Sequence, residues 1–382
     1  MKKLKILYFS NAFIAGHGGR LHSEAFLKEA EDHPAVELIN AFPKPLPSKP
    51  VIKSKMDSFR KKIKKNPYLQ VLFFYRRNLQ SYKTIIPIIE SLQPNILHIR
   101  LDSNFMIIKK IKNKFPSLIV TTEVNASPFD ENFANIANKS YFENLEEKSL
   151  KYAHANFFVS GFLRDRIIQT PVNSRDYVVH NGVEEIFFKL NTIKKASNGK
   201  IVFGYIGTID YHKNLDKLID AFEEVLQISD KKIELVIVGD GPLYKELKDY
   251  VLNKNLNNEV SFTGWVKHTE IPSYLQSIDI AIHHSAKPYM SPLKLFEYMA
   301  AGKAVIGPDI PAVREIFTSD ELCLVKADLS NLSSVMQMVL NDDSYRMKLS
   351  VNSRKIVKEK FKWSDNAEKI IAVMQTKLNE NN

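Results

Sequence analysis

The sequence has very little cysteine and no long apolar run. Cys323 is the only cysteine among 382 residues, which excludes an intramolecular disulfide framework and a zinc site built from clustered cysteines. No apolar run approaches the roughly 18–20 residues that span a bilayer. The apolar stretch at residues 6–9 is shorter than a signal-peptide core of about 7–15 residues, so it is interpreted as a first buried strand. We therefore expect a cytoplasmic protein.

The remaining composition is that of a folded chain with room for two domains. Hydrophobic residues make up 44% and charged residues 25% of the sequence, fractions that exclude general disorder. At roughly 100–200 residues per domain, 382 residues suggest two domains, each able to bury its own core.

The net charge of +11 is concentrated in one segment, residues 44–83, which holds twelve basic residues and one acidic residue, Asp57. Clustered basic and aromatic residues favour an anionic membrane surface, at about 1 kcal/mol per basic residue near the lipid. The same pattern also suits nucleic-acid phosphates or a solvated loop. We favour peripheral association with the inner face of the cell membrane and expect no nucleic-acid partner. The residues predicted to contact membrane or acceptor are Arg60, Lys61, Lys62, Lys64, Lys65, Phe73, Phe74, Arg76 and Arg77.

Short β-rich runs alternate with helical periodicity along the whole chain, the pattern of parallel sheets covered by helices. Strands are expected at 5–9, 36–40, 95–99, 118–122, 156–159 and 177–180, then at 201–206, 233–238, 260–262, 278–282, 304–306 and 322–325. Helices are expected at 21–31, 83–91, 105–114, 141–152, 215–227, 243–252, 271–276 and 293–300. This predicts an α/β fold with two doubly wound, Rossmann-like domains facing each other across a cleft, where ligands of such sheets bind.

The domain boundaries follow from a lapse in periodicity at 191–200, where Ser, Asn, Gly and Lys collect. We expect an N-terminal, acceptor-side domain at 1–190, which includes the basic segment, and a C-terminal domain at 200–362 that binds a nucleotide sugar. A final helix at 363–382 is expected to pack back on the N-terminal domain.

Two glycine turns in the second half each follow a strand. Gly207 and Thr208 end the first strand, with Lys213 ahead of the next helix, and Gly241 lies in the turn after the second strand. Such turns can hold phosphate oxygens through backbone N–H groups, although many α/β turns look the same without a ligand. The strand at 278–282 runs into His283 and His284, which either reach the cleft or are ordinary strand-end residues.

The most specific pattern begins at Ser291 and opens a helix. Lys294 and Glu297 are three residues apart and share a helix face. The backbone N–H groups of Leu293 and Lys294 lie in the first turn, where helices leave donors unpaired, and they suit a diphosphate. Glu297 is placed to accept from sugar hydroxyls. The alternative is a surface Lys–Glu ion pair.

Residues 203–315 resemble the donor-binding domain of glycosyltransferase family 4, a family of retaining transferases with the GT-B fold. The matching segments are FGYIGT (203–208), VIVGDGP (236–242), FTGWV (262–266) and SPLKLFEYMA (291–300), with HNGV (180–183) just before them. In the N-terminal half, a glycine-rich loop containing Gly18 and Gly19 resembles the loop that lies near donor and acceptor in this family.

The resemblance implies a role for each matching residue. Lys213 would bind the donor pyrophosphate, Glu297 the ribose, and the amides of Leu293 and Lys294 the phosphates. Two positions depart from the family pattern: its first glutamate falls at Tyr289, and its arginine falls at Thr208. The predicted donor-binding residues are Gly18, Gly19, Gly207, Thr208, Lys213, Gly241, His284, Ser291, Leu293, Lys294 and Glu297.

The predicted catalytic residues are Glu123, Asn125, Lys213 and Lys294. Glu123 and Asn125 end the strand at 118–122, where many family members carry a histidine that faces the reacting sugar. They are therefore candidates to stabilise charge near the anomeric carbon. Arg100 and Asp102 point at the same cleft or form a structural ion pair.

The resemblance implies a retaining, hexosyltransferase-type enzyme. It would move a sugar from a UDP- or GDP-sugar to a lipid-linked or glycan acceptor in cell-envelope polysaccharide or glycolipid assembly. No D-x-D metal signature stands on a suitable loop, so we expect no metal and no other cofactor. The alternatives are a sugar-nucleotide epimerase or phosphorylase, and a non-catalytic protein of the same fold that binds membranes or nucleic acid.

Overall fold

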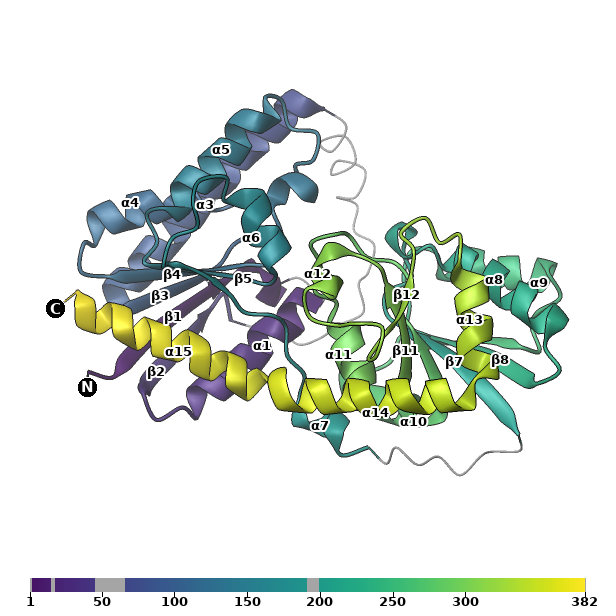
Figure 1. Cartoon of the computed structure of the whole chain (residues 1–382). Coiled ribbons are helices and arrows are strands. Elements are labelled where there is room, and N and C mark those ends of the chain that lie inside the picture. Colours follow the sequence, from purple (N-terminus) through teal and green to yellow (C-terminus); the bar gives the residue numbers. More distant parts are fainter. Residues whose placement is uncertain (1, 15–17, 45–65, 191–198, 382) are drawn as a thin grey trace. The chain divides into compact units, whose positions relative to one another are not determined.

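The computed structural model describes residues 2–14, 18–44, 66–190 and 199–381. It divides the chain into two compact units (Figure 1). The first unit comprises Met1–His180 and Trp363–Asn382, and the second comprises Asn181–Lys362.

The first unit is built on a six-stranded sheet in the order β2-β1-β3-β4-β5-β6, in which all neighbouring strands are parallel. The strands are β1 (Leu4–Ser10), β2 (Val36–Phe42), β3 (Ile96–Arg100), β4 (Ile119–Val124), β5 (Ala155–Phe158) and β6 (Asp176–Val178). The four inner strands, β1 and β3 to β5, are almost entirely buried, as expected for a parallel sheet covered on both faces.

Helices cover both faces of this sheet (Figure 1). α1 (Gly18–Glu31) and α15 (Trp363–Glu380) lie on one face, where alternate β1 residues such as Ile6 and Tyr8 pack against Ile370 and Met374 of α15. α3 (Pro67–Leu92), α4 (Ile107–Lys114) and α5 (Lys139–Leu150) cover the other face, and α6 (Gly161–Ile167) follows β5. The last helix of the chain therefore belongs to the first unit.

The second unit repeats the architecture with strand order β12-β11-β10-β7-β8-β9, again all parallel. The strands are β7 (Lys200–Ile206), β8 (Lys232–Val238), β9 (Val260–Gly264), β10 (Ile280–Ile282), β11 (Ala304–Pro308) and β12 (Cys323–Val325). The helices are α7 (Glu185–Phe188), α8 (Leu215–Ile228), α9 (Tyr244–Asn253), α10 (Ile271–Ser277), α11 (Leu293–Ala300), α12 (Pro311–Arg314), α13 (Leu332–Asn341) and α14 (Asp343–Lys360). The expected α/β class and both parallel sheets are thus confirmed.

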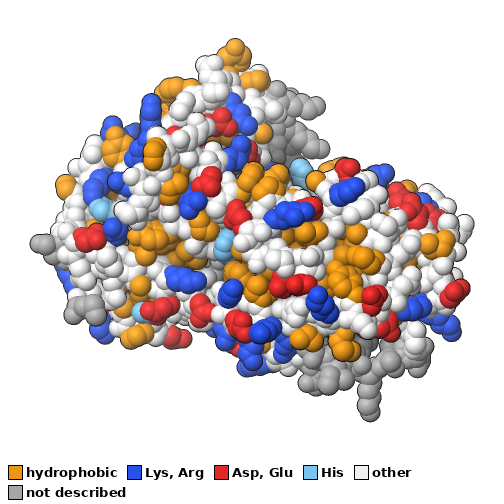
Figure 2. All heavy atoms as spheres, in the orientation of Figure 1, with side chains coloured by type: hydrophobic (Ala, Val, Ile, Leu, Met, Phe, Trp, Pro, Cys, Tyr) orange, Lys and Arg blue, Asp and Glu red, His pale blue; other side chains and the backbone are white. Residues whose placement is uncertain are grey.

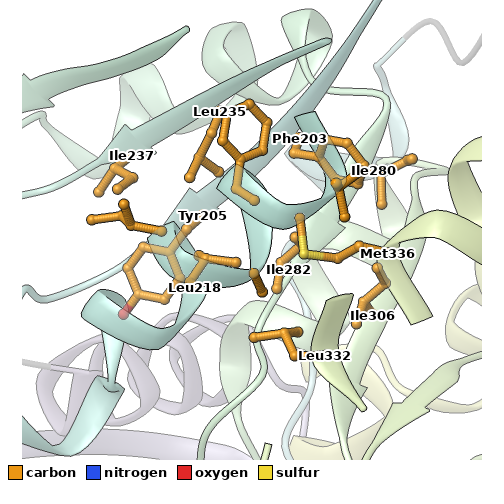
Figure 3. Close-up of a cluster of buried hydrophobic side chains, with 14 of the residues drawn as sticks. Phe203, Tyr205, Leu218, Leu235, Ile237, Ile280, Ile282, Ile306, Leu332 and Met336 are labelled. Atoms are coloured by element: carbon orange, nitrogen blue, oxygen red, sulfur yellow. The ribbon is translucent and has the colours of Figure 1, made fainter. Parts of the chain in front are cut away.

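Strand alternation divides the core of this unit between two helical layers. Phe203 and Tyr205 of β7 face Leu218 of α8 and Met336 of α13, as Figure 3 shows. The intervening residues, Val202 and Ile206, face the other layer, which contains α10, α11 and α14. A period of two in the strand therefore fixes which helices cover each face.

The chain passes from the first unit to the second earlier than the sequence suggests. Val183, Phe187 and Phe188 are buried in the core of the second unit, and Val183 forms a parallel bridge with Lys362. Residues 181–190, which we had placed in the N-terminal domain, thus belong to the second unit. Residues 191–198 of the expected linker lie outside the described residues.

Among the described residues, no helix combines the length and apolar character needed to cross a membrane. On the face drawn in Figure 2, basic, acidic and apolar side chains are interspersed.

Candidate functional site

The glycine turns of the second unit bring two loops into direct contact at the carboxyl ends of β7 and β8. Gly239 has φ +140°, and a Cβ there would lie 1.9 Å from the carbonyl oxygen of Gly207. A Cβ on Gly241 would lie 2.1 Å from the carbonyl oxygen of Ile209. Close approach of backbone to backbone therefore explains these glycines without a ligand. Thr208 is exposed at the same turn.

The start of α11 carries a buried charge pair. Lys294 Nζ donates to Glu297 Oε2 at 2.6 Å, and His268 Nε2 lies 3.5 Å from Glu297 Oε1. The Glu297 side chain is only 6% exposed. Burial alone would raise the pKa of Glu297. The charge of Lys294 and the hydrogen bond with His268 outweigh burial, so the pKa is lowered overall and the carboxyl stays ionised. The alternative of an ordinary surface pair does not fit this burial.

Tyr298 anchors α11 to the end of β7. Its hydroxyl donates to the carbonyl oxygen of Ile206 at 3.0 Å and accepts from the N–H of Ile206 at 2.8 Å. Tyr298 is completely buried. These bonds tie the second turn of α11 to β7. At the start of the same helix, the N–H groups of Leu293 and Lys294 precede the i→i−4 hydrogen-bond ladder.

Several buried polar atoms at this edge of the sheet have no hydrogen-bond partner among the described residues. They are both ring nitrogens of His283, Nδ1 of His284, Oγ of Ser291 and Oδ1 of Asn181. Nε2 of His284 lies 3.0 Å from the carbonyl oxygen of Asn214, and the Asn181 amide donates to the carbonyl oxygen of Ser291. Because buried polar atoms in folded proteins are almost always paired, this group is suited to a polar ligand.

Both histidines are held neutral. Burial lowers the pKa of His283 well below its usual value, and the positive charges of Lys213 and Lys294 add to the effect. Burial likewise lowers the pKa of His284 to about 4, with a further contribution from Lys213. Lys213, which ends the 3-10 turn Tyr211–Lys213, therefore acts electrostatically on both histidines, and Lys294 acts on His283. The edge therefore combines two cationic side chains with neutral imidazoles, a setting that suits an anion.

Tyr289, at the position of the missing family glutamate, is buried, and Lys287 Nζ lies 5.8 Å from its ring centroid.

The first unit has its own polar group, centred on Glu123 at the end of β4. Glu123 accepts from the Tyr8 hydroxyl at 2.9 Å and lies 2.8 Å from His22 Nδ1. It also accepts from the Arg100 guanidinium and from the Asn125 amide. Burial raises the pKa of Glu123, but His22 and Arg100 hold it well below the usual range. Glu123 is therefore a fully compensated carboxylate.

Other buried groups surround this carboxylate. His98 Nε2 lies 3.8 Å from Glu123, and burial lowers the pKa of His98 to about 4. A Cβ on Gly19 would lie 3.1 Å from the Arg100 guanidinium, so this glycine lets the start of α1, which begins at Gly18, approach the group closely.

A pocket opens beside the group. Its lining residues are His22, Phe26, Glu123, Asn125, Phe157, Val159, Val179, Trp363, Asn366 and Ile370. Trp363, the first residue of α15, packs edge-on against the His22 ring at a centroid distance of 4.6 Å. The C-terminal helix thus completes the wall of this pocket.

The structure corrects one membrane or acceptor assignment, that of Phe74, and one of the two alternatives for Asp102. Phe74 is completely buried in an aromatic cluster with Phe105, Phe129 and Phe142, so its predicted contact with membrane or acceptor is wrong. Arg77 forms an ion pair with Asp102, so Asp102 pairs with α3 and not with Arg100. Phe73 and Arg76 also lie on α3, whereas Arg60, Lys61, Lys62, Lys64 and Lys65 lie outside the described residues.

Sequence reasoning missed four residues of these two groups: His22, Tyr8 and His98 around Glu123, and His268 beside Glu297. Each of these residues lies on a different helix, strand or turn from the carboxylate that it contacts, so no residue spacing in the sequence predicts the contact. Tyr8 and His98 are register partners on the paired strands β1 and β3, and only the structure shows that pairing.

The comparisons with known proteins agree with this architecture. Residues 187–356 match the family model described as glycosyl transferases group 1. The chain is 24% identical to an uncharacterized glycosyltransferase of Methanocaldococcus jannaschii over 63% of each chain. It is 27% identical to the alpha-monoglucosyldiacylglycerol synthase of Streptococcus pneumoniae over 42% of this chain and 38% of the relative. The chain thus spans less than two thirds of the length of these curated relatives.

Solved structures match over nearly the whole chain. HepE of Anabaena, crystallised in complex with UDP and glucose, superposes with a TM-score of 0.70 at 16% identity, covering 98% of this chain and 100% of its own. Sucrose-phosphate synthase of Thermosynechococcus elongatus superposes with a TM-score of 0.73 at 15% identity, covering 98% and 99%. The chain has the GT-B fold, and residues 187–356 are similar to the glycosyl transferases group 1 family.

Proposed function

We propose that this chain is a glycosyltransferase that moves a sugar from a nucleotide-diphosphate sugar to a lipid-linked or glycan acceptor. One observation supports the donor class most strongly: Lys294, Glu297, His283 and Ser291 gather at one sheet edge, inside the segment that matches the family model. A UDP-sugar is the first donor to test, because the similar HepE structure was solved with UDP and glucose.

In this proposal the second unit binds the donor. Glu297 is ionised and accepts from the ribose hydroxyls, while the first-turn amides of α11 and the charges of Lys213 and Lys294 bind the diphosphate. As the bond from sugar to phosphate breaks, negative charge grows on the leaving diphosphate. Preorganised cations and helix N–H groups stabilise that charge. Because Lys213, Lys294 and the start of α11 supply positive charge at the diphosphate, we propose that the reaction needs no metal.

The first unit contributes the acceptor side. Glu123 is saturated with donors, so we assign it a positioning role: it holds Arg100, His22 and Asn125 in fixed orientations. Asn125 is half-buried, lines the pocket and is oriented by its hydrogen bond to Glu123, so we assign its amide a contact with the sugar. Retention of anomeric configuration is proposed from the family resemblance.

A membrane-linked acceptor agrees with the names of some relatives. Among them are the alpha-monoglucosyldiacylglycerol synthase and, at 24% identity over 188 residues, the phosphatidylinositol N-acetylglucosaminyltransferase gpi3 subunit of Schizosaccharomyces pombe. The basic segment at 44–83 is the second support. We therefore propose a hexosyltransferase for glycolipid or cell-envelope polysaccharide assembly, acting at the inner face of the cell membrane.

The test is turnover of radiolabelled UDP- and GDP-sugars by the purified chain, with and without a bacterial lipid extract. We expect release of nucleotide together with transfer of label into lipid or glycan. Glu297→Ala should abolish this, whereas Lys348→Met, at an exposed lysine of the same unit, should retain it. An altered sugar nucleotide formed without acceptor would indicate an epimerase. No turnover of any donor with any acceptor would contradict the proposal.

A further inference from the structure

Helix α3 exposes an apolar stripe that the expected membrane contacts do not include. The exposed fractions are 79% for Tyr68, 62% for Leu72, 40% for Tyr75 and 49% for Leu79. Their spacing of four, three and four residues places them on one side of the helix. Six of the eighteen exposed large apolar side chains of the described residues lie on this one helix. Apolar side chains gathered on an exposed surface mark an interaction site.

The rest of α3 shows that most of the stripe lies outside the core, although the Tyr75 ring touches its edge, 5.7 Å from Phe74 and 5.8 Å from Phe142. The residues that α3 buries are Gln70, Phe74, Asn78, Ile85, Ile86 and Ile89. Phe74 contacts Phe105, Phe129, Phe133 and Phe142, so the core-facing side of this helix is already fully packed. The stripe is therefore a second apolar side, on a helix that is fixed in place by the first.

The charge around the stripe has one sign. Arg76 and Lys83 lie beside it on the helix, and α3 has no acidic residue before Glu90. Residues 45–65, which precede the helix in sequence, hold eight basic residues and one acidic residue. An apolar stripe beside basic residues is complementary to an anionic lipid surface, because the leucines can enter the acyl boundary while the cations meet the head groups. The tyrosines suit the interface, since each ring has an apolar body and a polar tip.

We propose that the stripe formed by Tyr68, Leu72, Tyr75 and Leu79 docks the chain on an anionic bilayer. The inference rests on the membrane partner proposed above but does not depend on glycosyl transfer. It replaces Phe74, which is buried, with residues that can reach lipid. The proposal also predicts that apolar and basic side chains of α3 both contribute to binding the bilayer.

The experiment is sedimentation of the full-length chain with phosphatidylcholine vesicles, with and without phosphatidylglycerol. We expect binding only to the anionic vesicles. The double variant Leu72→Ser/Leu79→Ser should weaken that binding about tenfold or more, since both side chains lose their apolar contact with lipid. Arg76→Gln/Lys83→Gln should weaken it as well, and should reduce its dependence on salt.

The matched control is Leu252→Ser, which changes a leucine of α9 that is 59% exposed and should not alter binding. Thermal unfolding of each variant checks that it is folded. Unchanged vesicle binding of the stripe variant would overturn the proposal, as would an equal loss in Leu252→Ser. The proposal would also be overturned if the wild type is a dimer, the stripe variant is a monomer, and both still bind vesicles. The stripe would then be the contact surface for a second copy of the chain.

The two proposals can fail separately. Thermal stabilisation by UDP should be the same in the stripe variant and the wild type. If vesicle binding is lost while the UDP effect remains, docking is supported whatever the enzyme transfers. If no nucleotide sugar is turned over but vesicle binding still depends on the stripe, only the transferase proposal fails.

Discussion

Replacing Glu123 with glutamine tests whether the first unit depends on a compensated buried carboxylate. Glutamine has nearly the same volume as glutamate but carries no charge. Its NH2 group would face the hydrogen-bond donors that point at a carboxylate oxygen in the wild type. Arg100, whose side chain is 15% exposed, would lose its charged partner. Removing one partner of a buried ion pair costs about 3–5 kcal/mol, and we take about 3 because Arg100 is not fully enclosed.

This free energy corresponds to a measurable shift in melting temperature. A unit of roughly 150–250 residues loses about 2–4 °C per kcal/mol, so the first unit of Glu123→Gln should melt about 6–12 °C below the wild type at neutral pH. Differential scanning calorimetry is the assay. The control is Glu90→Gln, which removes the partner of Lys114 in an exposed pair and should cost less than about 1 kcal/mol.

The pH dependence provides a second check. The pKa of Glu123 in the folded protein is well below its ordinary value of about 4.5. Its stabilisation is therefore fully present above pH 4.5 and is lost as the pH falls through the folded pKa. The difference between wild type and Glu123→Gln should stay constant near neutrality and shrink below pH 4.5. A Glu123→Gln protein that melts no lower than Glu90→Gln would refute this reasoning.

Three further predictions concern the second unit and the chemistry. Tyr298→Phe removes the hydroxyl that bonds both backbone groups of Ile206, and should lower the free energy of unfolding by about 1–3 kcal/mol in urea titrations; an unchanged midpoint would contradict this. Gly239→Ala places a Cβ against Gly207 and should lower the free energy of unfolding clearly more than Gly199→Ala. Gly199 also has a positive φ, +70°, but a Cβ there would meet no atom within 4 Å. Equal unfolding midpoints would argue against the contact between the two loops. Transfer activity should be unchanged by EDTA. If EDTA abolishes activity and added metal restores it, the lysines of the second unit are not sufficient to stabilise the leaving diphosphate.

Most of the fold could be predicted from the sequence because its strands are short, buried and apolar. All twelve strands of the described residues lie where short β-rich runs between helical stretches indicate them. Helix α14 could not be found in this way. Only Leu349, Ser353 and Val357 of its residues are buried, so its sequence has no continuous apolar period. The first half of α3 was interpreted only as a basic, aromatic segment, because its apolar residues occupy two sides of the helix.

The candidate site could be predicted only in part. Lys294 and Glu297 share a helix, so their spacing revealed the pair. The partners of Glu123 come from β1, α1 and β3, and parallel strands bring them together in a way that no local pattern encodes. The buried state of His283 depends on its surroundings in the folded unit, which residue identity alone does not reveal.

The most direct test of the central claim is nucleotide binding at the start of α11, measured by thermal shift with UDP, GDP, ADP and CMP and their common sugars. A ligand that binds only the folded state adds about 2.7 kcal/mol of stability at a hundredfold excess over its Kd. We predict a clear upward shift with one nucleoside diphosphate, lost in Glu297→Ala and retained in Lys348→Met. No shift with any of these ligands, or an equal shift in Glu297→Ala, would contradict the donor site described here.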